Sequence, residues 1–174
     1  MYTAHIEGSG WKSSLERGHT MCANAMRLLL VLTGATVTVW AADPVLGTWK
    51  LDVAKSTYRP GPPPASETRV YQASAEGVKV TIVTTDANGK SATIEHPANF
   101  DGKDYAVTGS SRVNAISLKR IDDYKSEAIL KHASKIIGTA QRVVSSDGKT
   151  MTVRYKGTDA EGRDVDNVAV YMKQ

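Results

Sequence analysis

The sequence predicts an all-β protein, an antiparallel up-and-down meander of about eight to ten strands that closes into a barrel. From Gly47 onward, apolar residues recur with a period of two, which is typical of strands with one buried face. Turn dipeptides separate these runs, and ten strands are expected to close because closure removes exposed edges. The dipeptides are Glu76-Gly77, Asn88-Gly89, Asp101-Gly102 and Asp147-Gly148, and the last three are strong hairpin signals.

The expected strands follow one another with short connections, and no segment predicts an amphipathic helix of more than two turns. The exception is RPGPPP, Arg59 to Pro64, where four prolines predict a stiff extended linker between the first two strands. A polyproline docking site is the alternative interpretation of this segment. The strands are expected near residues 46–53, 67–75, 78–86, 91–98, 104–108, 114–121, 125–132, 136–146, 149–157 and 165–173.

An apolar run, Leu28 to Trp40, follows Met26-Arg27 and ends at Ala41-Ala42. This pattern is typical of a secretory signal peptide, so we expect cleavage after Ala41, or alternatively after Ala42. Residues 26–41 are then the signal peptide, and residues 42–174 form a single β-barrel domain. Residues 1–25 show no periodicity and precede the signal, which predicts a mis-annotated or non-structural extension. The alternative is a buried N-terminal helix or strand.

The apolar run from Leu28 to Trp40 also predicts where the protein is located and whether it stays in the membrane. It is shorter than the about 20 residues that a transmembrane helix needs, so we expect a periplasmic or secreted protein with no stable membrane insertion after cleavage. The single cysteine, Cys22, precedes the run, so the expected mature chain has no disulfide. The formal net charge of +4 is spread along the chain without a basic block, which argues against nucleic-acid binding.

No motif predicts a catalytic, metal or cofactor site. The expected mature chain contains two histidines, His96 and His132, on different strands and without further ligands at useful spacing. Nucleophile-elbow, phosphate-loop and dinucleotide-binding motifs are missing from the sequence.

The residue pairs expected across each hairpin indicate which side chains point into the barrel. If Glu76-Gly77 is a two-residue turn, Tyr71 faces Ile82 and Arg69 faces Thr84. The apolar alternation of Val78, Val80 and Ile82 marks the core face, so Arg69 and Tyr71 share it.

The turn at Asp147-Gly148 gives a second set in the same way. It pairs Val144 with Met151, Arg142 with Val153, and Ala140 with Tyr155. Because Met151, Val153 and Tyr155 alternate with polar residues, Arg142 and Tyr155 are expected to point inward.

A buried guanidinium needs a partner. If the hairpin from Asp86 to Ser91 keeps its register, Glu95 lies opposite Ile82 and could pair with Arg69. The alternative is that the arginines hold an anionic or polar ligand. The candidate ligand-binding residues are therefore Arg69, Tyr71, Arg142 and Tyr155.

The opening strand carries Gly47-Thr48-Trp49, and with it the chain resembles the calycin superfamily of lipocalins and fatty-acid-binding proteins. GTWKL (Gly47 to Leu51) resembles the first strand of fatty-acid-binding proteins, and NVAVYMK (Asn167 to Lys173) resembles their last strand. The chain is also similar to small exported bacterial proteins of unassigned function that open with GTWKLDVAKS and run through PGPPP into TRVYQ. The resemblance covers Gly47 to Gln174. It implies a calycin-like barrel with Gly47 and Trp49 as a structural motif near its closed end, and Gly47, Trp49, Leu51 and Val53 fall on one strand face.

Two departures from that family stand out. Only the proline-rich linker stands where fatty-acid-binding proteins have two lid helices. Their last strand carries an Arg-x-Tyr clamp for a carboxylate, whereas this chain has Ala169 and Tyr171. Alternation also favours Val168, Val170 and Met172 as the inward set, which would turn Tyr171 outward.

Together these features predict an exported, lipocalin-like protein that binds a small apolar or amphipathic molecule inside the barrel. The expected inner wall is apolar and is supplied by Val78, Val80, Ile82, Met151 and Val153. The alternative is a filled barrel that acts through its surface, as an inhibitor or an envelope interaction module. An enzyme is less favoured. The ligand and the oligomeric state are left open by the sequence.

Overall fold

The computed structural model describes residues 43–75 and 77–174, so the expected extension and signal peptide lie outside the described residues. Regular structure in this part of the chain consists of ten strands, and none of it is a helix long and apolar enough to cross a membrane. The strands are β1 (Gly47–Thr57), β2 (Ser66–Ser74), β3 (Gly77–Thr85), β4 (Ser91–Ala98), β5 (Asp101–Ala106), β6 (Ala115–Arg120), β7 (Lys125–His132), β8 (Lys135–Val144), β9 (Thr150–Thr158) and β10 (Asp164–Lys173).

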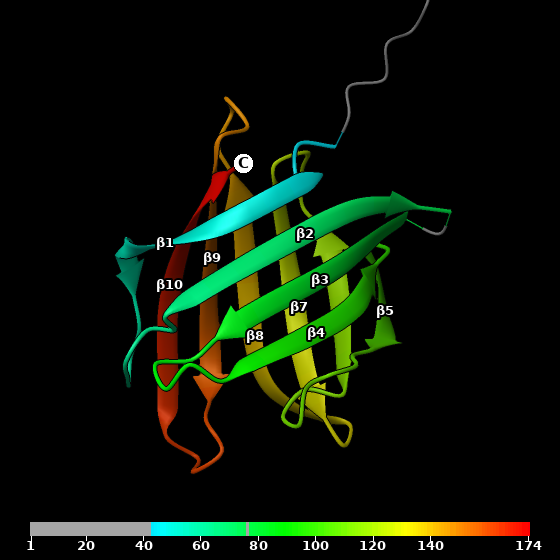
Figure 1. The fold of residues 1–174 in the computed structure, drawn as a ribbon. Helices are drawn as coiled ribbons and strands as arrows, with labels where there is room; N and C mark the ends of the chain where they lie inside the picture. Colours follow the sequence, from blue (N-terminus) through cyan, green and yellow to red (C-terminus); the bar gives the residue numbers. More distant parts are fainter. Residues whose placement is uncertain (1–42, 76) are drawn as a thin grey trace, which may run out of the picture. The chain divides into compact units, whose positions relative to one another are not determined.

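The strands form one antiparallel sheet in the order β4-β3-β2-β1-β10-β9-β8-β7-β6-β5. Figure 1 shows β1 to β4 as one layer that crosses the layer of β7 to β10 behind it. The two ends of the sheet meet at a short bridge, where Glu95 and Thr108 exchange two backbone hydrogen bonds of 3.1 and 2.9 Å. The barrel is therefore nearly closed, and the predicted antiparallel up-and-down meander of about eight to ten strands is confirmed.

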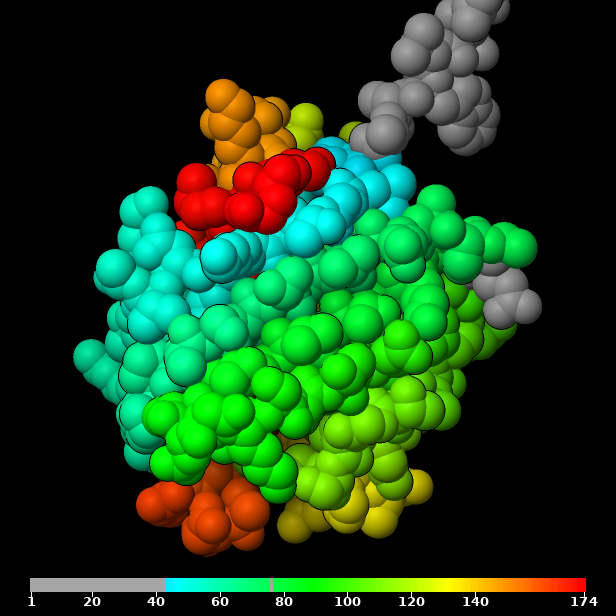
Figure 2. All heavy atoms as spheres, viewed as in Figure 1, coloured from blue at the N-terminus to red at the C-terminus, as the bar shows by residue number. Residues whose placement is uncertain are grey.

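The space-filling view shows the outer side of the first layer. Side chains of β1 to β4 cover this face of the barrel without a visible opening into the interior (Figure 2).

One end of the barrel is filled by large side chains. Trp49 has no exposed surface, and its indole Nε1 donates a 2.7 Å hydrogen bond to the carbonyl of Val45. Lys173 Nζ lies 5.1 Å from the centre of the Trp49 ring, a cation–π contact. Gly47 has φ +122°, and a Cβ there would approach Lys173 Cε to 3.0 Å, so this position requires glycine. We call this region the closed end; its fully buried side chains are Val45, Trp49, Val80, Met151 and Tyr171.

The predicted register of the hairpin around Asp147-Gly148 is confirmed. Val144 pairs with Met151, Arg142 with Val153 and Ala140 with Tyr155.

The predicted partners across the β2–β3 hairpin are wrong by two positions. Tyr71 pairs with Val80 rather than Ile82, and Arg69 pairs with Ile82 rather than Thr84. A shift of two residues leaves every side chain on the same face of the strand. Arg69 and Tyr71 therefore still share the inner face with Val80 and Ile82.

The β3–β4 hairpin is displaced from its predicted register by one residue. Glu95 pairs with Thr81, which places its carboxylate on the outer face, 2.9 Å from Lys79 Nζ. The predicted pair of Arg69 with Glu95 is therefore wrong, because a one-residue shift reverses the face of every side chain. The predicted hairpin turn at Asp101-Gly102 is also wrong: both residues belong to β5, which pairs with β6 and not with β4.

Two predicted side-chain directions are wrong as well. Tyr171 is fully buried and Ala169 is 5% exposed, so these two residues point inward on β10. Alternation failed there because β10 is apolar on both faces. Val53 is 37% exposed because the β1–β10 register shifts between Asp52 and Thr57.

Replacing Trp49 with alanine is expected to lower the free energy of unfolding by about 3 to 5 kcal/mol, because it opens a void in the closed end. It also leaves the Val45 carbonyl without its indole partner. Urea denaturation followed by circular dichroism measures the effect. Lys50→Ala, at the exposed neighbouring position on β1, is the matched control and should leave the unfolding midpoint unchanged.

Candidate functional site

A cavity of about 300 Å³ lies inside the barrel. The surface of its wall is mostly apolar. Apolar side chains come from β3, β4, β6, β7, β8, β9 and β10, and polar or ionisable side chains come from β2, β3, β4, β7, β8, β9 and β10. This combination is typical of small-molecule sites. The apolar side chains of the wall are Ile82, Ile94, Val107, Val113, Ile116, Leu118, Ala128, Leu130, Ala140, Val153 and Ala169.

The four candidate ligand-binding residues all lie on this cavity. Arg69 and Tyr71 come from β2, Arg142 from β8 and Tyr155 from β9. That they bind a ligand stays a prediction. Of the apolar wall expected from the sequence, Ile82 and Val153 line the cavity, whereas Val78, Val80 and Met151 are buried in the core outside it.

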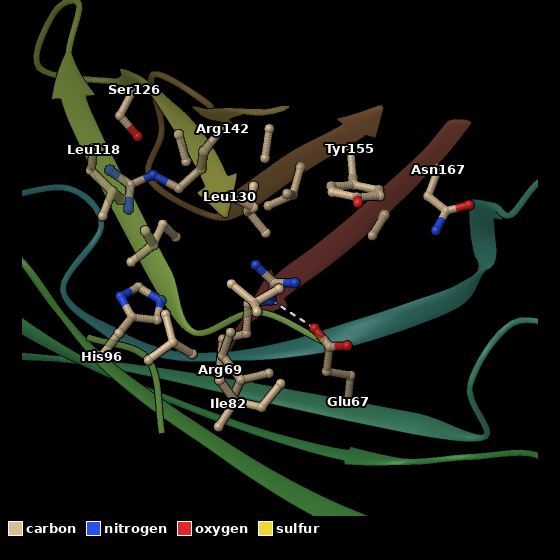
Figure 3. Close-up of a pocket in the computed structure, with 18 of the residues that line it drawn as sticks. Glu67, Arg69, Ile82, His96, Leu118, Ser126, Leu130, Arg142, Tyr155 and Asn167 are labelled. Carbon is tan, nitrogen blue, oxygen red and sulfur yellow. Dashed lines mark hydrogen bonds and ion pairs between the residues drawn. The ribbon is translucent and has the colours of Figure 1, made fainter. Parts of the chain in front are cut away.

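The charge of Arg69 is balanced inside the barrel by Glu67. Arg69 Nε donates a 2.7 Å hydrogen bond to Glu67 Oε1, and the Tyr171 hydroxyl donates a 2.6 Å bond to the same oxygen. The second carboxylate oxygen accepts a 3.1 Å bond from Thr84 Oγ1. Arg69 also lies over the Tyr171 ring, 4.8 Å from its centre. Figure 3 shows the Arg69–Glu67 contact at the edge of the cavity. We call Glu67, Arg69, Thr84 and Tyr171 the Glu67 cluster.

Opposing effects set the ionisation of the Glu67 cluster. Burial raises the pKa of Glu67, but the charge of Arg69 and the hydrogen bonds outweigh it, so the pKa is lowered from 4.5. Burial raises the pKa of Tyr171 well above 10, only partly opposed by Arg69. Glu67 is therefore a carboxylate and Tyr171 a neutral phenol at neutral pH. Glu67 was not among the site residues predicted from the hairpin registers, although Glu67, Arg69 and Tyr71 alternate on one strand face.

Unlike Arg69, Arg142 has no counter-charge among the described residues. It is 8% exposed, and it makes no ion pair and no hydrogen bond with any of the described residues. Its buried Nε is without an acceptor. The guanidinium instead lies over two rings, 5.3 Å from the centre of Tyr71 and 5.1 Å from the centre of Phe100. A positive charge thus faces the cavity without an anionic partner in this part of the chain.

Two further polar groups lie near Arg142. Ser126, 3% exposed, is its cross-strand neighbour on β7. His96, 9% exposed, is brought inward by β4, and its Nδ1 lies 2.9 Å from the carbonyl oxygen of Pro97. In Figure 3, Arg142, Ser126 and His96 lie toward one end of the cavity, and Tyr155 and Asn167 lie toward the other. Sequence analysis could not place His96 on a cavity because the β3–β4 register decides its face.

Tyr155 lies close to the barrel wall. A Cβ at Gly138 or at Gly157 would come within 2.5 Å of its hydroxyl oxygen, so the two glycines make room for the ring. The hydroxyl donates a 3.3 Å bond to the carbonyl of Ile137. Burial raises the pKa of Tyr155, with a smaller opposing effect of Arg112.

The Tyr155 end of the cavity adjoins a second, more open hollow of about 610 Å³, which we call the vestibule. The Arg112 guanidinium donates to the Thr158 carbonyl at its edge. The proline-rich linker forms another side, held by Arg59 N donating to Asn167 Oδ1 at 2.9 Å. The vestibule lies next to the cavity, because the two spaces share Tyr58, Val113, Leu130, Tyr155 and Asn167.

Metal binding has no candidate site in residues 43–75 and 77–174, where no three His, Cys, Asp or Glu side chains come together. The wall residues of the cavity also include no cysteine, and His96 is its one histidine.

The chain has structural similarity to solved proteins. No protein-family model matches the chain. No curated protein matches its sequence. Among solved structures, the chain is similar to the ileal bile acid-binding protein of zebrafish, solved in complex with cholic acid, with a TM-score of 0.46 and 11% sequence identity. The alignment covers 75% of this chain and 99% of that chain.

Replacing Glu67 with glutamine is expected to lower the free energy of unfolding by about 3 kcal/mol, because Arg69 would stay buried without a counter-charge. The pKa of Glu67 is lowered in the folded state, so its contribution to stability is present above about pH 4.5 and is lost as the pH falls through the lowered pKa. Urea unfolding from pH 7 to pH 3 measures both effects.

The acid-induced loss should be smaller in Glu67→Gln than in the wild type. Glu95→Gln removes a carboxylate of an exposed ion pair with Lys79 and is the matched control. Equal destabilisation by the two substitutions would contradict the role assigned to the Glu67 cluster.

Proposed function

We propose that the barrel is a binding protein for a small amphipathic molecule that carries one negative charge, held inside the cavity. The observation that carries this proposal is Arg142, a buried guanidinium without an anionic partner among the described residues. Burying a charge without a partner is costly. An anionic group of a ligand would supply the missing partner, as carboxylates and phosphates commonly do for arginine.

The charges around the cavity support a single negative charge on the ligand. Arg69 is neutralised by Glu67 at 2.7 Å. Arg142 then remains as the buried charge that has no ion pair in the described part of the chain, since Glu127, the other acidic residue of the wall, is exposed on β7. A ligand with two charges would leave one of them without a partner in an apolar wall, which is unfavourable.

The size and lining of the cavity support a compact, mostly apolar ligand. A volume of about 300 Å³ corresponds to roughly ten water molecules at ~30 Å³ each. Apolar side chains such as Leu118, Leu130 and Val153 would contact the body of the ligand. The vestibule would serve as its route of entry.

The internal cavity and its unpaired arginine favour ligand binding over the two alternative functions, a surface interaction and an enzymatic activity. A filled barrel acting through its surface would have no need of an internal cavity with an uncompensated charge. Enzymatic activity has no specific support. The hydroxyls of Thr84 and Tyr171 donate to Glu67, whose carboxylate is already paired with Arg69.

Removing the charge of Arg142 should abolish the preference for anions without harming the fold. We expect the wild type to bind 1-octanesulfonate more tightly than 1-octanol, measured by isothermal titration calorimetry. In Arg142→Met, affinity for the sulfonate should fall at least tenfold, about 1.4 kcal/mol, whereas affinity for octanol should change little. The free energy of unfolding should be equal or higher, because a methionine fills the site without a buried charge.

Arg154→Met is the matched control, because Arg154 lies on the next strand and pairs with Asp166 on the outside of the barrel. Its binding should equal that of the wild type. Native mass spectrometry of the protein purified from its own host should in addition reveal a bound small anion. Wild-type protein that binds neither probe would contradict the proposed function.

We also propose that the barrel is exported, on the strength of the apolar run before Ala41. The intact mass of the protein isolated from its own host should then correspond to a chain that begins at Ala42, or at Asp43 if cleavage follows Ala42. A mass that includes the run from Leu28 to Trp40 would contradict export by this route.

A further inference from the structure

His96 is a buried titratable group that faces the same cavity as two arginines. It is 9% exposed and lines the cavity together with Arg69 and Arg142. A carbonyl oxygen only accepts hydrogen bonds, so the 2.9 Å contact with Pro97 places a proton on Nδ1. Nε2 of the neutral ring is then an acceptor, and it has no hydrogen-bond partner among the described residues.

The empty cavity disfavours a second proton on this ring. Burial lowers the pKa of His96 from 6.5. The bond to the Pro97 carbonyl opposes this effect, and the positive charges of Arg69 and Arg142 add to it. His96 is therefore neutral at neutral pH while the cavity holds no anion.

Arg142 is the arginine near His96 that has no ion pair with a described acidic side chain. Glu127 on β7 also lines the cavity, but its side chain is exposed and forms no ion pair with Arg142. The partner of His96 on β3 is Val80, and β6 contributes Ile116 and Leu118 to the cavity wall. Glu67 on β2 is engaged by Arg69, Tyr171 and Thr84. Glu95, the neighbour of His96 on β4, points outward to Lys79.

We infer that the cavity takes up its anionic ligand together with a proton, which converts His96 from neutral imidazole to imidazolium. The inference rests on the proposed function. Burial and the positive charge of the arginines disfavour the second proton on His96. An anion beside Arg142 offsets both effects, because it opposes the positive charge and accepts a hydrogen bond from the imidazolium Nε2–H. Ligand and proton thus favour each other's binding, as thermodynamic linkage requires. The ligand class is a small monoanion that is bound more tightly in mildly acidic solution.

The sign of the effect follows from the linkage. The pKa of His96 is higher in the complex than in the empty protein, so affinity rises as the pH falls through the pKa of the complex. It stops rising below the pKa of the empty protein. Between these two values, affinity changes by up to tenfold per pH unit, the limit for one proton taken up per ligand.

The experiment uses 1-octanesulfonate, because a sulfonate keeps its charge throughout the pH range. Calorimetric titrations of the wild type between pH 5 and pH 8 should show affinity increasing toward acid pH. Repeating them in buffers of different ionisation enthalpy measures the proton uptake directly. 1-Octanol is the uncharged control and should bind with no pH dependence.

His96→Gln keeps a polar side chain but cannot titrate, so its affinity for octanesulfonate should be independent of pH. If this variant does not fold, a measurement on the wild type tests the same proposal. Nuclear magnetic resonance should show the titration of His96 moving to higher pH when octanesulfonate is bound. The internal control is His132, exposed at the end of β7, whose resonances should not change when the probe is added.

The outcomes separate the two proposals. Octanesulfonate binding with the same affinity from pH 5 to pH 8, or an unshifted His96 titration in the complex, would overturn proton-coupled uptake and leave the proposed function standing. Failure of the wild type to bind either probe at any pH would overturn both.

Discussion

The carboxylate of Glu67 organises the interior of this barrel. One buried group on β2 accepts hydrogen bonds from Arg69, Thr84 and Tyr171, and so joins β2 to β3 and, across β1, to β10. A buried ion pair of this kind contributes little net stability compared with apolar packing, but losing one partner is strongly unfavourable. Because Glu67 is fully engaged, it is not available to Arg142. The division between a compensated and an uncompensated arginine follows from this one side chain.

The cavity itself results from a gradient in side-chain size along the inner faces of the strands. At the closed end, Trp49, Met151 and Tyr171 fill the space between the two layers. Farther along β7, β8 and β10, the inward positions are occupied by small residues, Ala128, Ala140 and Ala169. Small side chains cannot span two layers that pack about 10 Å apart, so the interior stays open there. Gly138 and Gly157 extend the gradient by letting the Tyr155 ring lie against the wall.

The sequence predicted the number, direction and order of the strands, because these depend on period-two alternation and on turn residues. Side-chain faces depended on turn length. The turn at Asp147-Gly148 gave the correct register, the β2–β3 turn was displaced by two residues without consequence, and the β3–β4 turn was displaced by one. That single residue turned Glu95 outward and His96 inward. Tyr171 was assigned to the wrong face because β10 is apolar on both sides, so alternation carries no information there.

Both proposals rest on polar and charged side chains that point into the cavity. Inward positions of a strand are normally apolar, and exceptions to this pattern are expected at functional sites. In the Glu67 cluster, the two buried charges of Glu67 and Arg69 compensate each other. Arg142 and His96 do not: Arg142 lacks an anion, and burial together with nearby positive charge disfavours a second proton on His96. A single anion placed between them would remove both deficits. Ligand binding and protonation therefore belong to one event in this cavity, since the same negative charge stabilises the guanidinium and the imidazolium.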